Sequence, residues 1–159
     1  MNDLERIVAD ASRIFDLKHH CSEAIVMAVG GFYLDPYPDL LTRVACPFGG
    51  GVGGCRDELC GLVSGATIVL GALWGRTSYA EDDKWLYEVV CACRNRFIET
   101  NGTSLCRPLR DHYAVDGGRC GPLVEQATRD LVLLIEQTAQ ANPAAAARLA
   151  RRATIQDEM

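Results

Sequence analysis

Residues 59–74 decide the fold, and their sequence is LCGLVSGATIVLGALW. Wound as a helix, this stretch is apolar on nearly every face, which is typical of a helix that other helices surround. Its most apolar part covers only residues 62–74 and is interrupted by small polar residues and glycines. A membrane span needs about 20 apolar residues. We therefore predict a buried central helix and no contact with a membrane.

Five further segments have the spacing of helices. In residues 4–17 the apolar side chains recur at i, i+3 and i+4, as on one face of an amphipathic helix. Residues 103–121 are predicted to be irregular, and no segment alternates like a strand for more than four residues. We therefore predict an all-α fold, a compact bundle of about five helices around the central apolar helix, with a glycine-rich loop and an irregular segment that carries cysteines. The remaining predicted helices are 24–32, 39–45, 82–100 and 122–138.

The length and the charge limit the classes of protein. A chain of 159 residues fits a single domain. We expect residues 1–141 to form one cysteine-rich helical domain and residues 142–159 an exposed helix or tail rich in alanine and arginine. The net charge of −5 disfavours nucleic acid as a partner, because nucleic-acid binders usually carry a basic face. The first residues lack the basic and apolar regions of a signal peptide, so the expected compartment is the cytoplasm.

Eight cysteines are the unusual feature of the composition. No Cys-x-x-Cys pair occurs, which excludes thioredoxin-type motifs, ribbon-type zinc sites and c-type haem attachment. Cys91 and Cys93 lie inside a predicted helix and are expected to be small buried apolar residues, whereas Cys46, before Pro47, is ambiguous. The others lie at predicted helix starts or in irregular segments, where thiols can converge and helix N–H groups can stabilise a thiolate; they are Cys21, Cys55, Cys60, Cys106 and Cys120.

The run FGGGVGG at residues 48–54 cannot be regular structure, because consecutive glycines have no side chains to pack. It matches the dinucleotide fingerprint formally, but no strand precedes it and position 74 is Trp rather than an acid, so we reject that interpretation. The run is either a tight turn between two close helices or a backbone that wraps a cofactor and donates N–H groups to it, and the two roles are compatible. The candidate cofactor-binding glycines are Gly49, Gly50, Gly51, Gly53, Gly54 and Gly61.

Residues 60–65, Cys-Gly-Leu-Val-Ser-Gly, resemble the Cys-Gly-Ala-x-x-Gly motif of the C_GCAxxG_C_C family of redox-active proteins, with Leu62 in place of alanine. The resemblance covers most of the chain, from residues 21–25 through the glycine run and the central helix. A related domain in split-Soret cytochromes resembles an iron–sulfur module, although their haem-binding cysteines have no counterpart here. The resemblance leaves Cys55 outside the family's four defining cysteines and implies that these are Cys21, Cys60, Cys106 and Cys120.

Three functional hypotheses follow. The first is a small electron-transfer protein or redox subunit, rather than a stand-alone enzyme, that holds a 2Fe–2S or 4Fe–4S cluster through these four thiols, with Cys55 as a substitute ligand, and exchanges electrons with a partner protein. The second is a thiol–disulfide protein without metal, and the third is a zinc-binding structural or sensing module. A homodimer is compatible with each. Histidines are further candidate ligands, although solvent-facing loop positions are commoner for them: His19, His20 and His112.

Overall fold

The computed structural model describes residues 1–150 of the chain. Within that range the protein has no β-strand, and a single antiparallel bridge joins Leu59 to Leu105. The all-α prediction is therefore confirmed. The helices are α1 (Asp3–Asp16), α2 (Cys21–Tyr33), α3 (Asp39–Ala45), the 3-10 turn η1 (Cys46–Phe48), α4 (Gly61–Trp74), α5 (Lys84–Asn101), α6 (Cys106–Tyr113), the 3-10 turn η2 (Val115–Gly117), α7 (Gly121–Ala141) and α8 (Pro143–Ala146).

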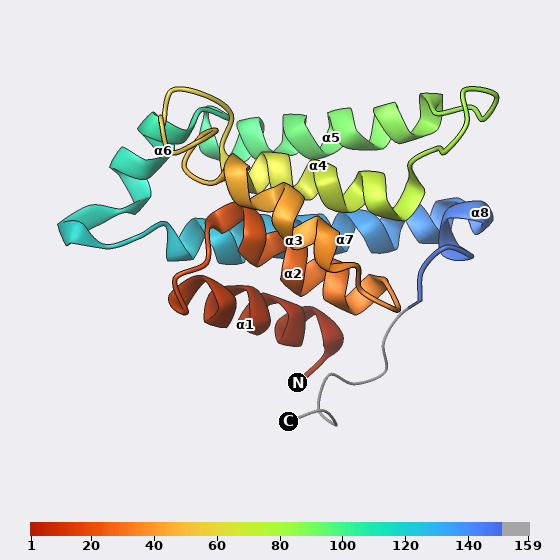
Figure 1. Ribbon diagram of the computed structural model, residues 1–159, viewed down its shortest axis with the longest axis horizontal. Helices are drawn as coiled ribbons and strands as arrows, with labels where there is room; N and C mark the ends of the chain where they lie inside the picture. Colours follow the sequence, from red (N-terminus) through yellow and green to blue (C-terminus); the bar gives the residue numbers. More distant parts are fainter. Residues whose placement is uncertain (151–159) are drawn as a thin grey trace.

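Helix α4 is the centre of the bundle, as its apolar sequence predicts. It contacts α2, α5 and α7, which lie around it (Figure 1). Val69 and Leu70 are fully buried, and burial of each such side chain contributes about 1.5–3 kcal/mol to folding. Gly65 allows α2 to approach closely, because a Cβ there would collide with the Ile25 side chain and lie 2.9 Å from the Ser22 carbonyl oxygen. None of the helices described here is long and apolar enough to cross a membrane.

Helix α1 packs across α2 and α7 (Figure 1). The apolar stripe seen in its sequence is buried, with Ala11 completely covered and Ile7 nearly so. On the edge of this interface, Arg129 of α7 donates two hydrogen bonds to the Glu5 carboxylate. Both side chains are well exposed, so this ion pair adds less than about 1 kcal/mol, and the apolar contact carries the interface.

Two predictions for the second half of the chain are corrected. Residues 103–121 contain a regular helix, α6, because Pro108 lies in its first turn, where the missing N–H would have no helical partner, and Leu109 is buried. Cys91 is exposed rather than buried. Helix α5 covers α4 and α7 with one stripe that includes Phe97, and Cys91 lies outside that stripe.

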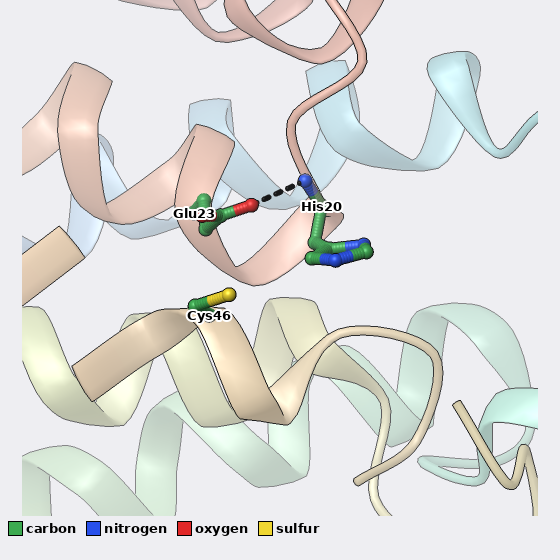
Figure 2. A group of neighbouring side chains, drawn as sticks. All are labelled: His20, Glu23 and Cys46. Carbon is green, nitrogen blue, oxygen red and sulfur yellow. Dashed lines mark hydrogen bonds between the residues drawn. The ribbon is translucent and has the colours of Figure 1, made fainter. Parts of the chain in front are cut away.

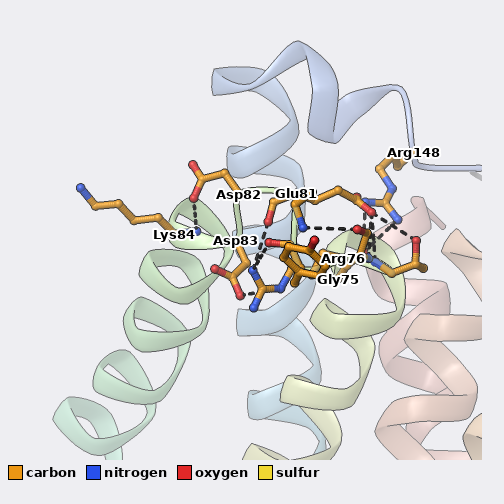
Figure 3. A network of polar contacts seen from close by, with 11 residues as sticks. Gly75, Arg76, Glu81, Asp82, Asp83, Lys84 and Arg148 are labelled. Carbon is orange, nitrogen blue, oxygen red and sulfur yellow. Dashed lines mark hydrogen bonds and ion pairs between the residues drawn. The ribbon is translucent and has the colours of Figure 1, made fainter.

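The C-terminal segment packs on the bundle in its described part. The sequence predicts an exposed tail from residue 142, but Ala145 is fully buried, and its carbonyl oxygen accepts a hydrogen bond from Trp74 Nε1 at 3.2 Å. Arg148 donates to the Gly75 carbonyl oxygen beside the α4–α5 connection, where Arg76 pairs with Asp83 (Figure 3). The part of the predicted tail at residues 151–159 lies outside the described residues.

Candidate metal centre

Four cysteines stand at the starts of four helices. Cys21 and Cys106 are the first residues of α2 and α6, and Cys60 and Cys120 are the N-cap residues of α4 and α7. Figure 1 shows these four helix starts at the same end of the bundle, on the left of the view. A helix N-terminus carries unpaired N–H groups and a partial positive charge. The fold therefore brings four thiols to one place and surrounds them with groups that favour negative charge.

Backbone pairing joins the starts of α4 and α6. The Cys60 N–H donates to the Ser104 carbonyl oxygen at 2.7 Å, and the Cys106 N–H donates to the Glu58 carbonyl oxygen at 3.0 Å. The bridge between Leu59 and Leu105 lies between these two bonds. Two cysteines that are 46 positions apart in the sequence (60 and 106) are thus held side by side by their own main chains.

The four thiols interact electrostatically. Burial raises the pKa of Cys60 to about 12, and the neighbouring sulfurs of Cys21, Cys106 and Cys120 add to the rise. Burial is also the largest cause that raises the pKa of the other three thiols, and Cys21 contributes further to the shifts of Cys106 and Cys120. In the absence of a bound cation, the four thiols are therefore neutral at pH 7.

The glycine run contacts this centre through its first half. The Gly50 N–H donates a hydrogen bond to Cys21, which offsets part of the rise in pKa that burial causes. A Cβ at Gly51, where φ is +68°, would lie 2.6 Å from the Cys106 Cβ. Gly61, at the start of α4, has the same role, since its Cβ would lie 2.6 Å from the Cys21 Sγ. The loop is therefore both a left-handed turn and a wall of the centre.

The other predicted site residues lie outside the four-thiol group. Gly53 and Gly54 are exposed, and among residues 1–150 a Cβ at either would meet no atom within 4 Å apart from its chain neighbours. Gly49 packs against the His20 ring rather than against a thiol. Cys55 is exposed, and it is not among the charges that act on the four thiols. Its carbonyl oxygen accepts a hydrogen bond from Arg107.

Arginines around the centre escaped the sequence analysis. The pKa of Cys106 is lowered by the charges of Arg56, Arg107 and Arg110, and that of Cys120 by the charges of Arg110 and Arg119. Burial raises both pKa values by more than these charges lower them. The only signal in the sequence is the repeated occurrence of arginine next to cysteine, as in Cys55-Arg56, Cys106-Arg107 and Arg119-Cys120. These cations compensate part of the negative charge that four thiolates would create.

Arg119 also holds the centre together. Its guanidinium donates hydrogen bonds to the carbonyl oxygens of Phe15 and His19 and lies 3.7 Å from the centroid of the Phe15 ring. It thereby ties the connection between α1 and α2 to the start of α7. Arg119 is thus one of the contacts that place Cys21 near Cys120, beside the direct packing of α2 on α7.

A second group of potential ligands lies beside the first. The ligand atoms of His20, Glu23 and Cys46 are all within 4.8 Å of one another (Figure 2). Within residues 1–150 this is the one set of three or more His, Cys, Asp or Glu side chains that meets this distance, so the four thiols are spread more widely. The sequence offered little sign of this group, because Cys46 is 23 positions from Glu23.

The comparison with known families shows which family the chain belongs to. The family model described as "Putative redox-active protein (C_GCAxxG_C_C)" matches residues 19–133, well over half of the sequence. The chain belongs to the C_GCAxxG_C_C family. The match confirms the resemblance noted in the sequence, and it includes the glycine run and all four cysteines of the centre. A C_GCAxxG_C_C protein is described as redox-active, which agrees with a site built from thiols. No match was found among curated proteins or among solved structures.

Proposed function

We propose that this protein is an electron-transfer protein that holds an iron–sulfur cluster through Cys21, Cys60, Cys106 and Cys120. The observation that carries the proposal is the convergence of four thiols from four helix N-termini at one end of the bundle. Iron–sulfur clusters are commonly held by four cysteine thiolates, so the donor set fits the group. The cluster, when bound, supplies a carrier for single electrons.

The surroundings suit an anionic group. The sulfide ions of such a cluster cancel most of the iron charge, so four thiolates give the bound cluster a net negative charge, and helix N-termini stabilise negative charge by about 0.3–1 kcal/mol each at exposed sites. The Gly50 N–H already donates to Cys21, and hydrogen bonds to sulfur raise the reduction potential of a cluster. The glycines at 51 and 61 keep side chains away from the thiols. The chain's own groups thus bind and orient the cluster and set its potential.

The spacing of the thiols favours a cluster over a single zinc ion. Zinc bound to four sulfurs at about 2.3 Å places neighbouring sulfurs about 3.8 Å apart. No three of the four thiols lie within 4.8 Å of one another in the described chain. A cluster instead distributes the thiolates over several iron ions, which a wider arrangement accommodates.

The thiols are poorly suited to a disulfide switch without metal. Disulfide exchange requires a thiolate, and reactive cysteines have a lowered pKa. Here burial raises the pKa of all four thiols, that of Cys60 to about 12. Metal binding overcomes this cost, because the cation displaces the protons directly.

The partner in this proposal is a redox protein with an acidic face, encountered in the cytoplasm, where thiols remain reduced. Arg56 and Arg107 are both exposed beside Cys106, but Arg107 is paired with Asp57 at 2.6 Å, so the choice of partner rests on the charge of Arg56. Attraction between exposed charges speeds the encounter of two proteins and weakens as salt increases. We expect the rate of electron exchange to fall with ionic strength.

The first experiment is anaerobic purification followed by visible absorption and by assays of iron, zinc and acid-labile sulfide on one sample. We expect brown protein with similar amounts of iron and sulfide. Cys60→Ser should lose the colour and the iron, whereas Cys91→Ser, which changes an exposed thiol on α5, should keep both. Protein that contains only zinc, or that stays colourless after reconstitution with iron and sulfide, would overturn the proposal. A coloured Cys60→Ser variant would show that the ligand set is wrong.

A further inference from the structure

His20, Glu23 and Cys46 meet at the junction of two segments. His20 is the N-cap residue of α2, and Glu23 lies in the first turn of that helix. Cys46 follows the last residue of α3 and opens η1. Figure 2 shows the three side chains as neighbours, with the Glu23 carboxylate facing the His20 backbone N–H, and their ligand atoms are all within 4.8 Å of one another. None of the three belongs to the four-thiol centre.

The donor set is that of a borderline divalent cation. An imidazole nitrogen, a carboxylate oxygen and a thiolate sulfur are the ligands that zinc uses in proteins, and Co²⁺ binds to such sites as well. Bonds of about 2.0–2.3 Å in a tetrahedral site put ligand atoms about 3.3–3.8 Å apart. To bind one ion, the three ligand atoms must move about 1 Å closer to one another. The exposed side chains of His20 and Cys46 can rotate to bring them closer.

Glu23 is the buried member of the group and is hydrogen-bonded to the other two residues. Its residue is only 9% exposed, and its carboxylate accepts the His20 N–H at 2.7 Å and a hydrogen bond from the Cys46 thiol. The one ion pair of Glu23 within residues 1–150 is with His19 Nδ1, 3.7 Å from Oε2, which is charged only when that imidazole is protonated. A nearly buried carboxylate without a permanent cation is costly. A divalent ion would supply that charge.

Gly49 leaves room for the His20 ring. A Cβ at position 49 would lie 2.6 Å from the His20 Cβ and 3.0 Å from Nδ1. The absence of a side chain at 49 thus lets the imidazole lie against the glycine-rich loop, on the side of Glu23 and Cys46. The loop thus has two neighbours in this arrangement: Gly50 and Gly51 line the thiol centre, and Gly49 leaves room for His20.

We propose that His20, Glu23 and Cys46 bind one Zn²⁺ ion, at a site separate from the four-thiol centre. On binding, the Cys46 thiol releases its proton to solvent and the sulfur forms a bond to zinc, while the His20 imidazole and one carboxylate oxygen of Glu23 give the other two bonds. The fourth position is taken by water, because His20 and Cys46 are exposed to solvent. The site can therefore accept a small anionic ligand in place of that water.

The test uses Zn²⁺ and the rate of alkylation of each cysteine by iodoacetamide, followed by mass spectrometry of the whole chain. We expect Zn²⁺ to slow the alkylation of Cys46 and to leave that of Cys91, an exposed thiol on α5, unchanged. Glu23→Gln keeps an oxygen that can accept the His20 N–H and removes the charge. It should lower the affinity for Zn²⁺ by at least about tenfold, because even the partners of metal ligands contribute that much.

Cys60→Ser separates this proposal from the iron–sulfur proposal. The protection of Cys46 by Zn²⁺ should persist in Cys60→Ser, since Cys60 is not one of the three zinc ligands. His20→Ala is a second variant in case Glu23→Gln fails to fold, and it should abolish the protection as well. Equal alkylation of Cys46 with and without Zn²⁺ would overturn the proposal. So would protection that survives both Glu23→Gln and His20→Ala, because zinc would then be bound by other groups.

Discussion

At the scale of single residues, the thiols of the centre oppose ionisation. Burial raises the pKa of Cys60 from 9.0 to about 12. In the unfolded chain this thiol loses its proton from about pH 9, whereas the folded metal-free protein keeps the proton, so the unfolded state is favoured as pH rises. The contribution of Cys60 to stability is thus fully present below pH 9 and is lost between pH 9 and about 12.

We predict that the free energy of unfolding of the metal-free protein falls as pH rises above 9, by a few kcal/mol at most from Cys60. Urea unfolding under reducing conditions at several values of pH measures this change. Cys60→Ser should show a smaller fall than the wild type, and Cys91→Ser, at an exposed position, should match the wild type. An equal fall in the wild type and in Cys60→Ser would contradict the assignment of this effect to Cys60.

Two glycines of α4 give a matched pair of substitutions. A Cβ at Gly61 would lie 2.6 Å from the Cys21 Sγ, whereas a Cβ at Gly71 would meet no atom of the rest of residues 1–150 within 4 Å, apart from its own helical turn. We predict that Gly61→Ala lowers the iron and sulfide content sharply, because the thiol must move. Gly71→Ala should keep both and stabilise the protein by about 0.5–1 kcal/mol, since alanine favours a helix over glycine. Normal iron content in Gly61→Ala would show that the close approach is dispensable.

At the scale of elements, α7 carries an unsatisfied polar atom. The Thr128 hydroxyl is buried on this helix and has no hydrogen-bond partner among residues 1–150. Because an unpaired buried hydroxyl costs about 1–3 kcal/mol, we predict that Thr128→Val stabilises the fold by about 1 kcal/mol, measured as a higher urea midpoint. Thr138→Val is the control, because that hydroxyl donates to the Leu134 carbonyl oxygen and its removal should give no gain. A destabilised Thr128→Val protein would mean that the hydroxyl has a partner.

The same scale shows where helix prediction succeeds. The central helix was recognisable because its apolar residues cover every face. Helix α3 has the bounds that the sequence predicts, Asp39–Ala45. Helix α6 was missed because its eight residues include Pro108 and only two buried side chains, too few to give a period. Cys91 was misplaced because a stripe of apolar residues on α5 identifies the covered face only after α4 and α7 are in position.

At the scale of the whole molecule, the metal and the fold are coupled. The thiols join the starts of α2, α4, α6 and α7, so a bound cluster crosslinks four helices. We predict that removal of iron lowers the melting temperature and increases amide hydrogen exchange at these four starts, with little change in α8 at the other end of the bundle. Uniform exchange along the chain after removal would contradict this arrangement.

Protons compete with metal for the same sulfurs. Because all four thiols have a raised pKa, metal binding must release their protons, and the affinity for metal should fall as pH falls. Iron retention against a chelator at several values of pH measures this dependence. Retention that is independent of pH would indicate thiolates that are already ionised before the metal binds.

The sequence by itself determined the fold class, the central helix and the family, and the family motif singled out Cys21, Cys60, Cys106 and Cys120. Each of these depends on local signals: hydrophobic period, capping positions and the order of motifs along the chain. The tertiary structure decided which side chains meet. The approach of Cys60 to Cys106 depends on a pairing between distant backbones, and the meeting of Cys46 with Glu23 depends on how α3 returns to the start of α2. Such contacts have no local signal, because they arise from the packing of segments that are far apart in the sequence.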